Sequence, residues 1–81
     1  MTIEKLVERY IKKALQVFQQ IEKSSLLEER AEKVLDYARR YFEDATYYRE
    51  QKRFEIALTS VAYCEGLLDA LKLLGMVEFQ W

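Results

Sequence analysis

The sequence predicts an all-α fold, an up-down-up antiparallel three-helix bundle formed by a single domain over residues 1–81. Apolar residues recur at intervals of three and four along almost the whole chain, as on one face of an α-helix. Proline is absent and both glycines lie after residue 65, so little in the chain interrupts a helix. Two short polar breaks divide the pattern into three segments, and short connections make neighbouring helices antiparallel.

The first predicted helix spans about residues 3–23. Its apolar positions step by four and three along one face: Ile3, Val7, Tyr10, Ala14, Val17 and Ile21. Charged side chains, among them Glu8 and Lys12, lie on the opposite face. This segment therefore reads as an amphipathic helix with one buried side.

The second predicted helix spans about residues 26–51. The run Ser25-Leu26-Leu27-Glu28 has the pattern of a capping box, in which the serine and the glutamate satisfy free amides at a helix start. Its apolar stripe has an alanine at every seventh position, namely Ala31, Ala38 and Ala45. Small residues at this spacing allow a neighbouring helix to approach closely.

The third predicted helix spans about residues 54–74, after the break Gln51-Lys52-Arg53, and Gly75 is a suitable residue to end it. Apolar residues form two stripes on different sides of this helix. A helix that is apolar around so much of its circumference is either wedged between two others or offers a surface to a partner. The apolar tail, residues 76–81, can fold back onto the bundle, but the sequence leaves its placement open.

A recognisable pattern of short strings lies within about residues 26–76: Asp44-Ala45, Tyr47-Tyr48, Phe54-Glu55-Ile56-Ala57-Leu58, Tyr63-Cys64-Glu65-Gly66-Leu67-Leu68-Asp69-Ala70-Leu71 and Leu74-Gly75. In these strings the sequence resembles the archaeal family known as domain of unknown function 357. The sequence departs from the family pattern at Cys64, where alanine is expected, and at Lys52, where the turn usually has glycine. The resemblance implies a helical bundle from an archaeon, and it implies no activity and no functional residues.

The composition argues against most enzymatic and nucleic-acid functions. The chain has 13 Lys and Arg residues, 14 Asp and Glu residues and no histidine. Without histidine it lacks the usual general base and the usual nucleophile pairs, so we expect no enzyme and no cofactor. A net charge of −1 does not favour capture of nucleic acid. A single cysteine, a charged start and no apolar run of about 20 residues favour a cytoplasmic protein without a membrane span.

No metal site is expected, and three carboxylates are the candidates for one: Asp44, Glu65 and Asp69. They can converge if the second and third helices are antiparallel neighbours, and such a cluster can bind a divalent cation. The favoured interpretation is that they lie on solvated faces or pair with cations. Asp69, inside an apolar run, is expected to accept a hydrogen bond from a tyrosine.

Five residues are candidates for an interface: Ala62, Gly66, Ala70, Phe79 and Trp81. A glycine inside a helix costs about 1 kcal/mol relative to alanine, so Gly66 needs a compensating reason. Close approach of another backbone supplies one. Packing within the chain is the favoured interpretation, and contact across a dimer is the alternative.

The expected function is that of an uncharacterised small helical protein acting as a protein-interaction or structural module. Its partner is another protein or a second copy of the chain, which makes a homodimer one expected state. One alternative is a bundle that binds a small molecule or a divalent metal through the carboxylate cluster. A third is an RNA-associated accessory protein.

Overall fold

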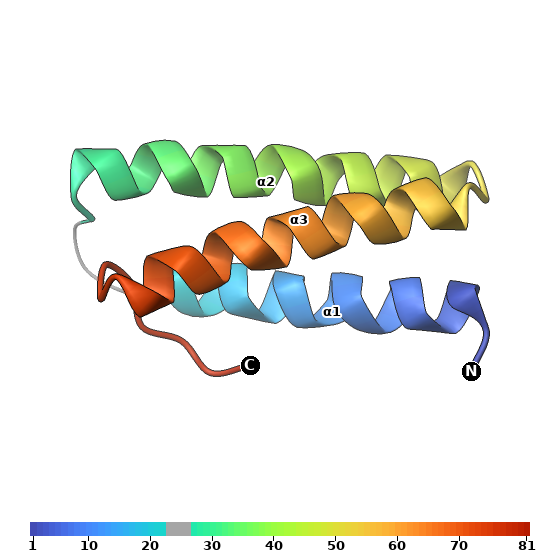
Figure 1. The fold of residues 1–81 in the computed structure, drawn as a ribbon, viewed down its shortest axis with the longest axis horizontal. Helices are drawn as coiled ribbons and strands as arrows, with labels where there is room; N and C mark the ends of the chain where they lie inside the picture. Colours follow the sequence, from blue (N-terminus) through green and yellow to red (C-terminus); the bar gives the residue numbers. More distant parts are fainter. Residues whose placement is uncertain (23–26) are drawn as a thin grey trace.

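Three helices form an antiparallel bundle, as the sequence predicts (Figure 1). The computed structural model describes residues 1–22 and 27–81. The helices are α1 (Ile3–Glu22), α2 (Glu29–Glu50) and α3 (Phe54–Leu73), and no strand occurs in the described part of the chain. Helices of 20 to 22 residues are about 30–33 Å long, which accounts for the longest molecular dimension of 36 Å.

The helix α3 is the central element of the bundle. It packs against both α2 and α1, most extensively against α2, whereas α1 and α2 touch each other least. Figure 1 shows α3 crossing in front of the other two helices, so that one of its sides has no helix over it. None of the helices, within the described residues, is long and apolar enough to cross a membrane.

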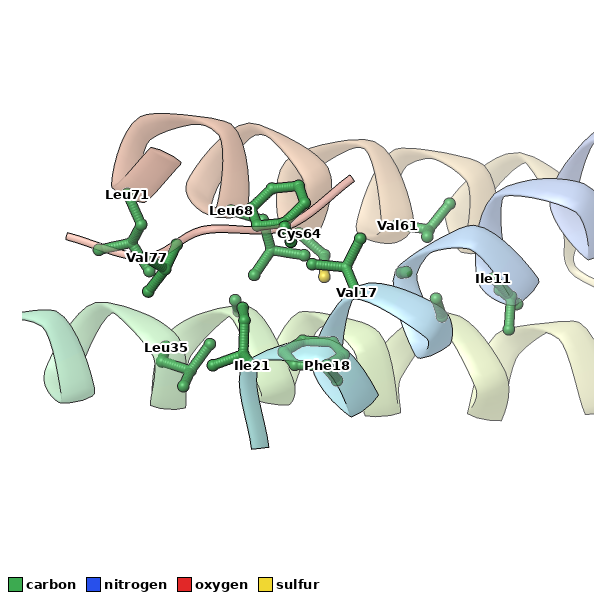
Figure 2. Packing of buried hydrophobic residues seen from close by; sticks show 14 of the residues in the cluster. Ile11, Val17, Phe18, Ile21, Leu35, Val61, Cys64, Leu68, Leu71 and Val77 are labelled. Carbon is green, nitrogen blue, oxygen red and sulfur yellow. The ribbon is translucent and has the colours of Figure 1, made fainter. Parts of the chain in front are cut away.

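A single apolar cluster runs through the bundle and includes residues from all three helices and the tail (Figure 2). The buried members on α1 are Val7, Ile11, Ala14, Val17, Phe18 and Ile21. The alanines Ala31, Ala38 and Ala45 of α2 are fully buried, as close approach of a neighbouring helix requires. Among the described residues, no polar or charged residue is buried in this core.

The start of α2 differs from the sequence-based prediction. The helix begins at Glu29 instead of near residue 26, and Glu28 is its N-cap residue, with extended backbone and no side-chain capping bond. Ser25, the first residue of the expected capping box, lies outside the described residues. Leu27 precedes the helix and packs against the core, so an apolar anchor occupies the position where the first helical turn was expected.

Two helix ends have the same geometry but different residues at the critical position. At the end of α2, the Lys52 amide donates to the Arg49 carbonyl and the Arg53 amide to the Tyr48 carbonyl, both at 2.9 Å. This is a Schellman motif, and Lys52 occupies its left-handed position with a φ of 60°. Gly75, with a φ of 73°, holds the matching position after α3, which confirms it as the residue that ends the helix.

Candidate functional site

The three candidate carboxylates do not form a cluster. Among the described residues, no group of three or more Asp, Glu, Cys or His side chains is placed to hold a metal ion. Glu65 faces Lys13 of α1, and Asp69 binds Trp81 of the tail, whereas Asp44 is exposed on α2. The alternative in which they converge is therefore not found, because Glu65 and Asp69 lie on the side of α3 that faces α1 and the tail. The exposed Asp44 and the pairing of Glu65 with Lys13 agree with the favoured interpretation.

Glu65 is the least well satisfied carboxylate among the described residues. Its Oε1 atom is buried without a hydrogen-bond partner, and the nearest cation is the Lys13 Nζ atom at 3.9 Å. Burial raises the pKa of Glu65, with a further rise from Asp69, and the opposing effect of Lys13 does not cancel the shift. Glu65 is thus a partly buried carboxylate that is weakly paired with Lys13. Among the described residues, it is not part of a group of side chains placed to hold a metal ion.

The neighbouring thiol of Cys64 is unsuited to catalysis. The side chain is fully buried. Burial, with a smaller effect of Glu65, raises the pKa of Cys64 to about 12. A thiol must lose its proton to act as a nucleophile, so this cysteine is a small core residue.

The tail folds back along the bundle (Figure 1) and contacts both α1 and α3 through hydrogen bonds. We call residues 76–81 the strap. The side-chain amide of Gln20, on α1, donates to the Gln80 carbonyl and accepts from the Gln80 amide, both at 2.8 Å. Val77 and Phe79 are buried, and Figure 2 shows Val77 beside Leu71 of α3.

Trp81 closes the strap onto both helices. Its indole Nε1 atom donates a 2.6 Å hydrogen bond to Oδ1 of Asp69. The Lys13 Nζ atom lies 5.2 Å from the Trp81 ring centroid and 5.4 Å from that of Tyr10. Lysines at this distance interact favourably with aromatic rings. Asp69 therefore has a tryptophan partner where a tyrosine was expected.

The strap is held close to energetic balance. Burying the Val77 and Phe79 side chains contributes about 3–6 kcal/mol. The three hydrogen bonds contribute about 1.5–4.5 kcal/mol more. Fixing six residues opposes this by about 6–12 kcal/mol of conformational entropy. The docked state of the strap is therefore favoured over the open state by at most a few kcal/mol.

The side of α3 that no helix covers is apolar and exposed. Its residues define the outer surface: Ile56, Ala62, Tyr63, Gly66, Leu67, Ala70, Leu73 and Leu74. At about 100° per residue they lie within an arc of roughly 140°, which contains no charged residue between Ile56 and Leu74. Leu73 is 87% exposed, Leu74 70% and Tyr63 55%.

The small residues of α3 face solvent within this outer surface. Ala62, Gly66 and Ala70 are all exposed, and a Cβ atom added to Gly66 would meet no atom within 4 Å. Packing within the chain, the favoured interpretation of this stripe, is therefore wrong. Tyr63, Gly66 and Leu67 line a shallow hollow of about 160 Å³ in this surface.

The other interface candidates, Phe79 and Trp81, belong to the strap. Phe79 is only 4% exposed, because its side chain packs in the hydrophobic core, so it offers little surface to a partner. Trp81 keeps 39% of its surface exposed, next to the outer surface but on the side of α3 that faces α1. Sequence reasoning missed Lys13 and Gln20 as partners of the strap, because nothing in the pattern links residues 60 positions apart.

A different hollow, of about 530 Å³, opens on α1 beside Arg49 of α2. Exposed cations line much of it, over the apolar Ile11 and Leu15. Glu8 pairs with Arg49 at 3.4 Å, which offsets part of the positive charge. Solvated cations on a helix surface are ordinary, whereas a long apolar arc is not, so the outer surface is the stronger candidate site.

Comparison with known proteins gives one match. A family model described as Protein of unknown function (DUF357) matches residues 8–77, which contain α2, α3, the outer surface and most of α1. This confirms the family resemblance seen in the sequence. No curated protein and no solved structure matches the chain.

Proposed function

We propose that this chain, which belongs to the family described as Protein of unknown function (DUF357), is a protein-interaction module that self-associates through the outer surface of α3. The observation that carries the proposal is the exposure of Leu73 and Leu74 in an arc that contains no charged residue between Ile56 and Leu74. The largest apolar patch on a small domain, commonly about 300–600 Å², is often a functional surface. The proposal assigns no enzymatic activity, cofactor or metal to the chain.

The size of this side of the molecule suits a dimer interface. The outer surface alone is about 30 Å long and about 10 Å wide, or roughly 300 Å². The flank of α2 extends it, because the Tyr41 and Tyr63 rings lie 4.3 Å apart and Tyr37 is exposed nearby on α2. A dimer that buries the 800 Å² or so typical of each partner would therefore use most of one side of the molecule, which measures 36 by 20 Å, and not the outer surface alone.

A second copy is the partner that the outer surface fits best. In a two-fold antiparallel pairing of α3 helices, an axis between Gly66 and Leu67 places each Leu67 opposite Gly66 of the other copy. The same axis places Tyr63 opposite Ala70. Each of these two contacts pairs a large side chain with a small one, and each occurs twice because of the symmetry. The outer surface is thus complementary to itself, as an isologous interface requires. An uncharged arc offers nothing that selects for nucleic acid or for a strongly charged protein.

The proposal includes the setting in which the module works. The single cysteine favours a reducing cytoplasm, and the archaeal origin rests on the family resemblance in the sequence. Under this proposal the protein has no membrane partner. Its interactions are with itself and with other proteins.

The test compares charge insertions at two exposed apolar positions by sedimentation velocity. The double variant Ala70→Glu/Leu73→Glu places four like charges in the proposed dimer and should convert it to monomer. The matched control Leu15→Glu, at a half-exposed leucine of α1, should leave the dimer intact. Circular dichroism checks that each variant is folded. The proposal is wrong if the double variant sediments like the wild type.

A further inference from the structure

The strap shows what the surface beneath it recognises. We call that surface the strap seat: Lys13 and Gln20 of α1, with Asp69 and Lys72 of α3. We infer that the seat is a second docking site, for an extended segment of another protein with apolar or aromatic side chains at alternate positions. The strap is then an autoinhibitory contact that holds the seat closed. This inference concerns a different surface from the proposed function and does not depend on it.

The side chains of the strap alternate as a bound peptide's do. Val77 and Phe79 are buried and Trp81 is partly covered, whereas Glu78 and Gln80 between them are exposed. An extended chain points successive side chains to opposite sides, so every second residue reaches the seat. Recognition of extended peptides uses this division between buried and exposed positions.

Each contact of the seat specifies part of the ligand's chemistry. The Gln20 amide bonds to backbone groups of Gln80, so it holds the peptide without reading its sequence. The Lys72 Nζ atom lies 4.9 Å from the Phe79 ring centroid, and Lys13 lies similarly near the Trp81 ring. Asp69 accepts the indole N–H. The preferred segment therefore reads apolar, any residue, phenylalanine, any residue, tryptophan.

The strap is built to leave the seat without unfolding the helices. Gly75, with its φ of 73°, ends α3 and separates the strap from the helix. Within the described residues, the hydrogen bonds that hold residues 77–81 all involve a side chain of Gln20, Asp69 or Trp81. Opening of the strap beyond Met76 therefore breaks no backbone hydrogen bond of a helix. A ligand must compete with the docked strap. Its apparent affinity is therefore its affinity for the open form multiplied by the fraction of molecules that are open.

The experiment uses the full chain and a fluorescein-labelled peptide with the sequence of residues 75–81. Anisotropy measures binding of the peptide to the wild type and to Trp81→Ala. In this variant the strap loses the hydrogen bond and the ring contacts of Trp81, and the residues of the seat are unchanged. The peptide should bind about tenfold more tightly to the variant, because loss of these contacts raises the open fraction. A control peptide with alanine in place of tryptophan should bind at least about tenfold more weakly.

Three results would overturn the inference. One is the absence of saturable binding to a Trp81→Ala chain whose circular dichroism matches the wild type. Another is equal binding of the control peptide. The third is dimerisation of Trp81→Ala in the Ala70→Glu/Leu73→Glu background, which would assign the seat to a second copy's strap. If Trp81→Ala does not fold, Trp81→Phe replaces it, since this variant removes the hydrogen-bond donor and keeps an aromatic ring, although a smaller one.

Discussion

The indole of Trp81 donates a 2.6 Å hydrogen bond to the carboxylate of Asp69, twelve residues earlier in the chain. This contact ties the strap to α3, while Lys13 beside the same ring ties it to α1. One aromatic side chain thereby links three segments of an 81-residue protein. In a domain this small, which buries little surface, such a contact contributes a sizeable share of stability.

The Asp69→Ala substitution tests this link. It should lower the free energy of unfolding by about 1 kcal/mol, because it removes the acceptor of one hydrogen bond. It should also shift Trp81 emission to longer wavelength, because the indole becomes more exposed to water. Trp81 is the only tryptophan, so the fluorescence reports this site alone. Unchanged emission and unchanged stability in urea would contradict the role assigned to Asp69.

The raised pKa of Glu65 predicts a particular dependence of stability on pH. Burial favours the protonated form in the folded state, so this contribution is fully present below the unfolded-state pKa and is lost as pH rises through the raised folded value. Glu65→Gln should therefore stabilise the protein at neutral pH relative to the wild type. The advantage should shrink as pH falls below the unfolded-state pKa.

Thermal unfolding followed at a series of pH values measures this difference. Glu55→Gln, at an exposed position in the first turn of the same helix, is the control and should keep the wild-type profile. A Glu65→Gln protein less stable than the wild type at neutral pH would mean that the ion pair with Lys13 outweighs burial.

The two Schellman motifs predict opposite effects of substitution at equivalent positions. Lys52→Gly should stabilise the protein by about 1 kcal/mol, because a non-glycine residue is strained at positive φ. Gly75→Ala should destabilise it by a similar amount, about 1 kcal/mol, for the same reason. Urea midpoints measure both changes. Equal effects of the same sign would show that backbone strain is not the controlling factor.

Gly66 separates the stability of the chain from its self-association. Gly66→Ala should stabilise the folded chain by about 0.5–1 kcal/mol, since the added Cβ atom meets nothing and alanine favours the helix. In the proposed dimer the same methyl group faces Leu67 of the second copy, so association should weaken. Unfolding in urea at low concentration measures the first effect, and sedimentation the second. Tighter association of Gly66→Ala would contradict the α3 pairing.

The sequence predicted the helices well because their signals are local. The pattern indicated residues 3–23 and 54–74, and the structure has Ile3–Glu22 and Phe54–Leu73. The start of α2 lies about three residues later than the pattern indicated: Glu28 has extended backbone as the N-cap residue, and Leu27 before it packs against the core.

The candidate site was only half predictable. The wide apolar circumference of α3 indicated that it either packs between helices or presents a surface, and the structure shows both. Which stripe faces solvent depends on where α1 and α2 lie, so Gly66 was assigned to the wrong environment. The strap contacts depend on pairing such as that of Gln20 with Gln80, for which periodicity gives no signal.

The mass of the wild-type chain in solution shows whether the chain pairs with itself through α3. Light scattering on a sizing column, over a range of concentrations, should approach twice the chain mass of 9.7 kDa as concentration rises. That result is expected if the outer surface of α3 pairs with itself. A mass of one chain at every concentration, with the helices intact by circular dichroism, would contradict self-association through this surface.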